Sequence, residues 1–247
     1  MVKRIFDLSL SIIGLVIFTP ILLPVCLIVF LQDFKSPFYI APRVGKDDKP
    51  FKMIKLRSMV VNADKTGVDS TSSNDSRITT VGKLIRKFKF DELTQLFNVL
   101  LGDMSFVGPR PNVKRETDLY TIEEKKLLKV RPGITDFSSI VFSDEGEILS
   151  NYDDPDIAYN QLIRPWKSRL GIFYVEKKTI SIDIKLIYLT IVSIISKKVA
   201  LRKINHILLK LNADENMIKV SLRTEKLQPY PPPGSKSIVT NRDGSLN

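Results

Sequence analysis

An uncharged, apolar run near the start of the chain restricts its fold more than any other feature. No charged residue lies between Asp7 and Asp33, and Leu8–Gln32 would form a helix about 37 Å long. Since the hydrocarbon core of a bilayer is about 30 Å thick, this run is long enough to cross a membrane. A secretory signal is the alternative, but the run is long for one and contains no small-x-small cleavage site. The sequence therefore predicts a membrane-resident segment.

Two prolines in the middle of this run bear on its topology. Pro20 and Pro24 each remove a backbone donor, and an interior proline costs a helix about 3 kcal/mol or forces a kink. Thr19 can return a hydroxyl hydrogen bond to a freed carbonyl. We therefore predict a re-entrant segment over residues 1–34, in which a helix breaks at Thr19-Pro20 and a second helix returns. A kinked helix that crosses once is the alternative.

The charges that flank the run favour the re-entrant topology. Lys3 and Arg4 precede the run, whereas Lys35, Arg43 and Lys46 follow it. Under the positive-inside tendency both flanks belong on the cytoplasmic side of a membrane. A segment that enters and leaves on the same face satisfies both flanks.

The overall charge and the scarcity of cysteine and histidine narrow the function. The chain carries 38 Lys and Arg against 27 Asp and Glu, a net charge of +11, which favours an anionic partner: nucleic acid, a membrane surface or a phosphorylated small molecule. A single cysteine, Cys26, excludes a disulfide framework and a Cys-rich metal site. The single histidine, His206, is expected to be a surface or half-buried residue of a helix. Any catalysis is therefore expected to use carboxylates, Lys and Arg.

Local patterns predict an α+β, mostly helical chain. Residues 36–60 form short extended pieces, the last of which would present Lys55 and Arg57 on one face, and residues 62–77 form a polar loop. Helices are expected over 91–101, 121–129, 157–163, 182–196 and 197–211, with Asp91 as an N-cap and Gly102 as a stop. We predict a membrane hairpin at 1–34, a compact catalytic domain with amphipathic helices at the membrane surface at 35–211, and a flexible tail at 212–247.

The candidate catalytic residues are the adjacent carboxylates Asp91 and Glu92. Acidic residues at a helix start can simply cap free N–H groups and suit the helix dipole. The functional interpretation is that Asp91 attacks phosphorus and Glu92 helps to hold a divalent cation. Two turns supply candidate phosphate ligands: Arg110 lies between Pro109 and Pro111, which restrict its backbone, and Arg131 precedes Pro132-Gly133. Each of these arginines can equally face solvent.

The order of these motifs resembles the bacterial sugar transferase family, the monotopic polyprenol-phosphate phosphoglycosyl transferases. The resemblance covers about residues 3–195 and is most specific in Asp91-Glu92-x-x-Gln95-Leu96-x-Asn98 and in Gly102–Pro111. It implies that Asp91 is the nucleophile that takes a sugar phosphate from a UDP-sugar and releases UMP. It further implies that Glu92 acts with Asp91 on Mg²⁺, that Arg110 binds phosphate, and that Arg86 and Arg131 support it. Lys55 and Arg57 are further candidates for phosphate binding.

The implied acceptor is polyprenyl (undecaprenyl) phosphate, and the product starts a glycoconjugate or polysaccharide at the cytoplasmic face of the bacterial inner membrane. Membrane lipids are the expected surroundings, nucleic acid is not expected because no groove-reading or base-stacking motif is found, and a homodimer is left open. The chain departs from the family over residues 136–169, which leaves the sugar open; a UDP-N-acetyl-aminosugar is favoured over UDP-galactose or UDP-glucose. A membrane-anchored basic binding module and a nucleotide-sugar hydrolase are the alternative functions.

Overall fold

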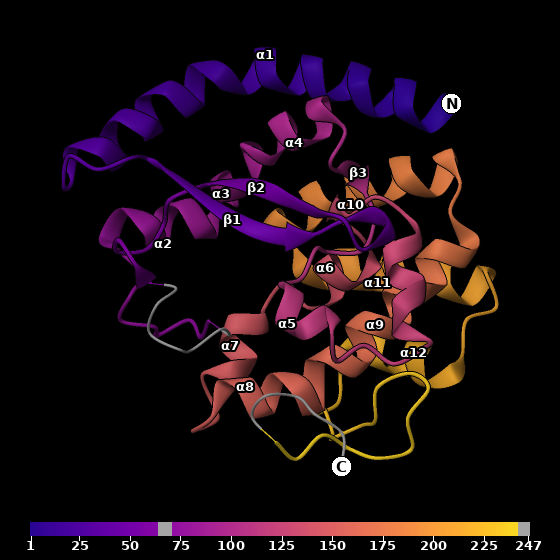
Figure 1. Ribbon diagram of the computed structural model, residues 1–247. Coiled ribbons are helices and arrows are strands. Elements are labelled where there is room, and N and C mark those ends of the chain that lie inside the picture. The colour runs from indigo at the N-terminus through magenta and orange to yellow at the C-terminus, as the bar shows by residue number, and fades with distance from the viewer. Residues whose placement is uncertain (64–70, 242–247) are drawn as a thin grey trace.

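The computed structural model describes residues 1–63 and 71–241 and confirms a mostly helical chain with few strands. Helix α1 (Val2–Leu31) leads into an antiparallel hairpin of β1 (Phe38–Val44) and β2 (Pro50–Leu56), with the short η1 (Lys46–Asp48) at its turn. The register pairs Phe38 with Leu56 and Val44 with Pro50. In Figure 1 this hairpin lies between α1 and the helical part of the molecule. The predicted 62–77 loop lies partly outside the described residues.

Three short helices and a pair of short parallel strands follow the hairpin. The helices are α2 (Thr80–Lys87), α3 (Phe90–Leu93) and α4 (Gln95–Leu101), and Gly102 ends α4 in the left-handed conformation as predicted. Strand β3 (Ser105–Val107) pairs with β4 (Gly133–Thr135). At the end of this pair a Cβ on Gly133 would stand 2.1 Å from the backbone nitrogen of Gly108. The close approach of the two backbones therefore requires glycine.

The largest hydrophobic core lies among the later helices. It is built mainly from α6 (Phe137–Val141), α9 (Arg164–Lys177), α10 (Ile180–Ile195) and α11 (Lys197–Lys210). The remaining elements are α5 (Lys114–Thr117), η3 (Glu124–Lys129), α7 (Glu145–Leu149), α8 (Pro155–Ala158), η4 (Tyr159–Ile163) and α12 (Glu215–Leu222). His206 is exposed on α11, as expected for a surface residue.

Helix α1 is helical through both prolines, so the gap that a helix-break-helix segment would show at Thr19-Pro20 is not seen. The Thr19 hydroxyl donates to the Leu15 carbonyl over 2.6 Å, one residue before the carbonyl that Pro20 leaves without its usual donor. Figure 1 shows α1 as an arch over the rest of the molecule. Among residues 1–63 and 71–241 it is the one helix long and apolar enough to cross a bilayer. The re-entrant topology stays a prediction.

Both ends of α1 are bound to the body of the protein. At the start, Arg4 donates to the carbonyls of Val99 and Leu100 over 2.6 and 3.0 Å, and the Asp7 carboxylate accepts from the Phe106 backbone over 3.2 Å. At the other end, the Arg57 guanidinium pairs with Asp33 over 2.5 Å.

The side of α1 away from the body remains apolar and exposed. Its exposed residues include Ile13, Val16, Ile17 and Leu27.

The described part of the segment predicted as a flexible tail, 212–247, contacts the helical body of the protein. Residues 215–222 form α12, and the Tyr230 ring packs on Trp166 with ring centroids 4.5 Å apart. Arg169 donates to the Pro231 carbonyl over 2.8 Å, and Gln161 donates to the Val239 carbonyl over 2.8 Å. Side chains and carbonyls of this proline-rich stretch contact α9 and η4. These contacts join residues far apart in the chain, so they leave no periodic pattern in the local sequence. Residues 242–247 lie outside the described residues.

Candidate active site

The backbone before α3 sets the position of the two candidate carboxylates. Lys89 is the N-cap residue and has a left-handed backbone (φ 55°), so α3 begins at Phe90. The prediction that Asp91 is the N-cap is therefore wrong: Asp91 lies one position inside the helix. Its carboxylate pairs instead with the Lys55 ammonium of β2, with 3.6 Å between Oδ2 and Nζ. Helix capping thus does not account for Asp91.

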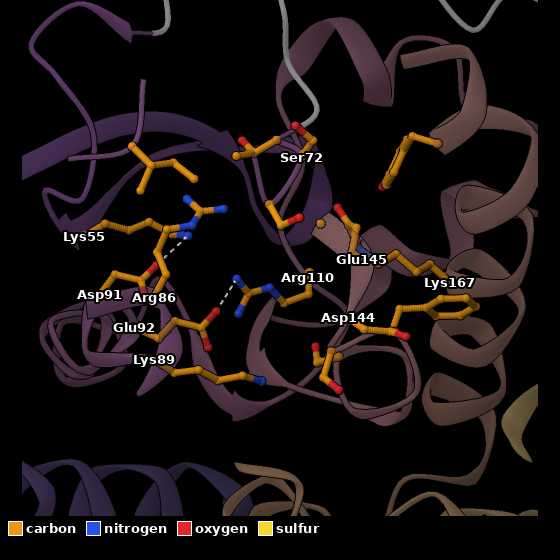
Figure 2. A pocket seen from close by; sticks show the side chains of 18 of the residues that line it. Lys55, Ser72, Arg86, Lys89, Asp91, Glu92, Arg110, Asp144, Glu145 and Lys167 are labelled. Carbon is orange, nitrogen blue, oxygen red and sulfur yellow. Dashed lines mark hydrogen bonds and ion pairs between the residues drawn. The ribbon is translucent and has the colours of Figure 1, made fainter. Parts of the chain in front are cut away.

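Glu92 is paired with the arginine of the proline-flanked turn. The distance between Arg110 Nη2 and Glu92 Oε1 is 2.8 Å, and Arg110 Nη1 donates to the Ile134 carbonyl over 2.6 Å. That carbonyl belongs to β4, which Gly108 and Gly133 bring against the turn. Figure 2 shows both ion pairs side by side at one end of a pocket. Two carboxylates and two cations therefore share one small region.

Burial and charge shift the pKa values of the two carboxyls in opposite directions. Burial raises the pKa of Asp91 above its ordinary value, although the Lys55 ammonium offsets part of the effect. Burial also pushes the pKa of Glu92 upward, but Arg110, Lys89 and Lys55 outweigh it and the pKa is lowered. Burial lowers the pKa of Lys55, and Asp91 opposes that shift. Asp91 is thus the carboxyl that is harder to ionise, and Glu92 is held as an anion.

The pocket in front of these carboxylates has a volume of about 740 Å³, within the usual range for small-molecule sites. The end that holds Asp91 and Glu92 carries an excess of positive charge, which suits phosphates. Besides Lys167, the basic residues that line the pocket are Arg43, Lys55, Lys83, Arg86, Lys87, Lys89 and Arg110. The opposite wall comes from α7, α9 and the segment at 72–73, and carries hydroxyl and carboxylate groups as well as Lys167.

The structure brings most of the predicted site residues together but places two of them elsewhere. Lys55, Arg86 and Arg110 line the pocket with Asp91 and Glu92. Arg57 lies just after β2, is 8% exposed, and directs its guanidinium to Asp33 and to the Ser36 carbonyl. Arg131 is exposed and donates to the Gly102 carbonyl over 2.7 Å. Asp33 and backbone carbonyls take up the donors of Arg57, and Arg131 uses its Nε on a backbone carbonyl, so neither arginine lines the pocket in this arrangement.

Several pocket residues were missed by the sequence analysis. Lys83, Lys87 and Lys89 lie within a few residues before Asp91. This cluster of basic residues could have indicated an anion-binding surface next to Asp91. Glu145 and Lys167 are 22 positions apart and carried no local signal beyond their place in the segment that departs from the family.

The donor atoms present are compatible with Mg²⁺ held jointly with a substrate. Within residues 1–63 and 71–241 no group of three or more His, Cys, Asp or Glu side chains could enclose a metal ion by itself. Mg²⁺, however, is commonly bound by one or two carboxylates together with substrate phosphates and water. Asp91 and Glu92 both line the pocket and provide such a pair.

Comparison with known proteins identifies a family and several relatives. The profile of the family described as bacterial sugar transferase matches residues 1–197. A UDP-N-acetylgalactosamine-undecaprenyl-phosphate N-acetylgalactosaminephosphotransferase of Aeromonas hydrophila is 31% identical over 198 residues, which are 79% of this chain and 44% of that protein. An undecaprenyl-phosphate glucose phosphotransferase of Komagataeibacter xylinus is 36% identical over 196 residues, 76% of this chain and 35% of that one.

A shorter relative matches over most of its own length. The uncharacterized sugar transferase EpsL of Bacillus subtilis is 32% identical over 205 residues, 83% of this chain and 92% of that protein. In contrast, the matched part of this chain spans less than half of the Aeromonas and Komagataeibacter proteins. On the strength of the profile match over residues 1–197, this chain belongs to the bacterial sugar transferase family.

Proposed function

We propose that this protein transfers a sugar-1-phosphate from a UDP-sugar to undecaprenyl phosphate through a covalent intermediate on Asp91. The observation that carries the proposal is the position of Asp91: a largely buried carboxylate, not used as a helix cap, that lines a basic pocket beside Lys55. The A. hydrophila and K. xylinus relatives are named for transfers of this kind to undecaprenyl phosphate.

The reaction has two displacement steps at the same phosphorus. An Asp91 carboxylate oxygen attacks the β-phosphorus of the donor, and the bond from that phosphorus to the bridging oxygen breaks, so that UMP leaves with that oxygen. An oxygen of undecaprenyl phosphate then attacks the aspartyl-bound phosphorus, and the bond to Asp91 breaks. The two steps avoid bringing the phosphates of donor and acceptor together at once.

The surrounding charges support this use of Asp91. Lys55 stabilises the ionised carboxylate from 3.6 Å, and Arg110 presents a rigidly held guanidinium to the phosphates while it also pairs with Glu92. Positive charge of this kind reduces repulsion between an anionic nucleophile and an anionic substrate. Glu92 and Asp91 would hold Mg²⁺, which would supply further positive charge to offset the negative charge of the transferring phosphoryl group.

The experiment that tests the proposal is mass spectrometry of the protein after exposure to a UDP-sugar without acceptor. We expect an adduct of one sugar phosphate on Asp91 in the wild type and none in Asp91→Asn, with transfer reduced by more than about a thousandfold. Asp118→Asn is the matched control, because that carboxylate is exposed and pairs only locally with Lys114 in the described structure. Normal transfer with no adduct under any condition would exclude the covalent intermediate.

The same assay separates the alternatives. A hydrolase would release UMP and free sugar phosphate whether or not undecaprenyl phosphate is present, whereas the proposed transferase forms lipid-linked product. A binding module would release no UMP. Chelation of divalent cations is expected to stop transfer and added Mg²⁺ to restore it. For the sugar, we favour a UDP-N-acetyl-aminosugar, and the relatives named for N-acetylgalactosamine and for glucose define the first donors to compare.

We further propose that both ends of α1 lie on the cytoplasmic side of the bacterial inner membrane, with the arch embedded in one leaflet. A straight helix of 30 residues is about 45 Å long and would separate its ends by a full bilayer if it crossed. Here Arg4 and Asp7 at one end and Asp33 at the other contact the same body. The exposed apolar side of α1 faces away from that body and suits lipid.

Cysteine labelling tests this topology in a Cys26→Ser background. Cysteines at positions 2 and 36 are expected to react with an impermeant reagent from the same side as one at position 122, an exposed position on the body. Reaction of positions 2 and 36 from opposite sides would exclude the re-entrant arrangement.

A further inference from the structure

The pocket extends well beyond the carboxylates that the proposed chemistry needs. Figure 2 shows Asp91 and Lys55 at one end and Glu145, Lys167 and Asp144 at the other, with Arg110 between them. All six residues line the same pocket. We define the selectivity wall as Ser72, Ser139, Asp144, Glu145, Tyr159 and Lys167.

The centre of the selectivity wall is an ion pair that leaves polar groups available to a ligand. Lys167 donates to the Glu145 carboxylate, and the two side chains remain 22% and 29% exposed. An ammonium has three donors and a carboxylate about four acceptor positions, so one contact between them uses only part of their capacity. The pair therefore offers both a donor and an acceptor to the pocket.

The segment that carries Glu145 is held in place by contacts to other parts of the chain. The Gly146 carbonyl of α7 accepts from the Ser73 backbone over 2.9 Å, which joins α7 to the segment at 72–73. Asp144 pairs with Lys197 at the start of α11, and Arg223 after α12 approaches it to 3.6 Å. Polar groups fixed on packed elements in this way can discriminate between ligands by geometry.

The chemistry of the selectivity wall indicates which part of a UDP-sugar it meets. The donor's phosphates belong at the basic end with Lys55 and Arg110, because the carboxylates of Asp144 and Glu145 would repel them. A carboxylate beside an ammonium and serine hydroxyls suits a neutral group rich in hydroxyls or amides. Stacking of a base is poorly served, because the Lys167 ammonium lies 5.3 Å from the centroid of the Tyr159 ring.

We infer that the selectivity wall binds the sugar of the donor and that the Glu145–Lys167 pair selects among sugars. This inference rests on the proposed function, because it assumes that a nucleotide-sugar occupies the pocket. A site that hydrogen-bonds a substrate hydroxyl rejects analogues in which that hydroxyl is missing, because its own buried polar groups are then left unpaired.

The test compares donors in Glu145→Gln and Lys167→Met. We expect the ratio of kcat/KM between the best and the second-best UDP-sugar to change by at least about tenfold, about 1.4 kcal/mol, while the inhibition constant of UMP stays within about twofold. Glu123→Gln and Lys126→Met are the matched controls, because that surface ion pair lies outside the pocket lining. Their donor ratios should equal those of the wild type.

Two outcomes would overturn the inference. If every donor lost the same factor, the pair would not select the sugar. If UMP inhibition weakened as much as donor use, the selectivity wall would bind the nucleoside instead. Should the single variants be unstable, Glu145→Lys combined with Lys167→Glu keeps an ion pair with reversed polarity and must still change the donor ratio.

Direct binding separates a failure of this inference from a failure of the proposed function. Asp91→Asn protein is not expected to turn over, so dissociation constants for UDP-sugars and for UMP can be measured on it with and without Glu145→Gln. A changed ratio among sugars supports the selectivity wall even if no transfer is found with the wild type. An unchanged ratio, in protein that binds UMP normally, rejects it even if transfer through Asp91 is demonstrated.

Discussion

Replacing Lys55 by methionine should make Asp91 harder to ionise. The Lys55 ammonium lies 3.6 Å from the Asp91 carboxylate and favours its charged form. Two unit charges at that distance interact by about 1.2 kcal/mol in water and by about 4.6 kcal/mol at an effective dielectric constant near 20. Loss of this interaction therefore raises the pKa of Asp91 further above its ordinary value.

Solvent and neighbouring cations weaken the effect of losing Lys55. The side chains of Lys55 and Asp91 are 24% and 12% exposed, so solvent screens the pair, and Arg86 and Arg110 remain near Asp91. We therefore expect the pKa of Asp91 to rise in Lys55→Met, by less than the unscreened interaction with Lys55 implies. Because the nucleophile must be deprotonated, the acidic limb of the pH profile should move upward by the same amount.

The assay is the pH dependence of kcat/KM for the UDP-sugar, at constant ionic strength and constant Mg²⁺, since this profile reports ionisations of the free enzyme. Lys52→Met is the matched control, because Lys52 is exposed on the same strand and does not line the pocket. Lys55→Arg keeps the charge and should leave the limb in place. A Lys55→Met profile that is lower at every pH but has an unmoved acidic limb would refute this reasoning and leave Lys55 a role in substrate binding alone.

Two further predictions concern the framework of the site. Arg164→Met leaves the fully buried Glu124 carboxylate without its cation. The change should therefore lower the free energy of unfolding by about 3–5 kcal/mol and the Tm by roughly 6–20 °C in a thermal melt. Lys126→Met, at a surface ion pair, should change the Tm by less than about 2 °C, and equal effects of the two changes would contradict the buried pair. Gly133→Ala would place a Cβ 2.1 Å from the backbone of the facing glycine, and should lower transfer by more than about tenfold as the arginine turn shifts. Gly14→Ala is the control and should keep most of the activity, because its Cβ meets only the end of a flexible side chain at 3.0 Å. Full activity of Gly133→Ala would show that the turn tolerates displacement.

Features that depend on neighbouring residues could be predicted from the sequence. The apolar run that forms α1, the stop at Gly102 and the helices near 182–211 follow from composition and periodicity over one or a few turns. Arg110 was a candidate because its proline neighbours restrict its backbone locally. For Asp91 the sequence allowed two roles, a helix cap and a nucleophile. The local pattern alone could not decide between them.

The tertiary structure decided what depends on residues far apart in the chain. Lys55 and Arg57 carry the same charge two positions apart, yet one faces Asp91 and the other pairs with Asp33, because β2 ends between them. The Glu145–Lys167 pair exists only because α7 and α9 pack around a common core. Periodicity records which side of an element is buried, whereas a binding site requires the ends of several elements to meet, and only the packing of the whole chain determines that.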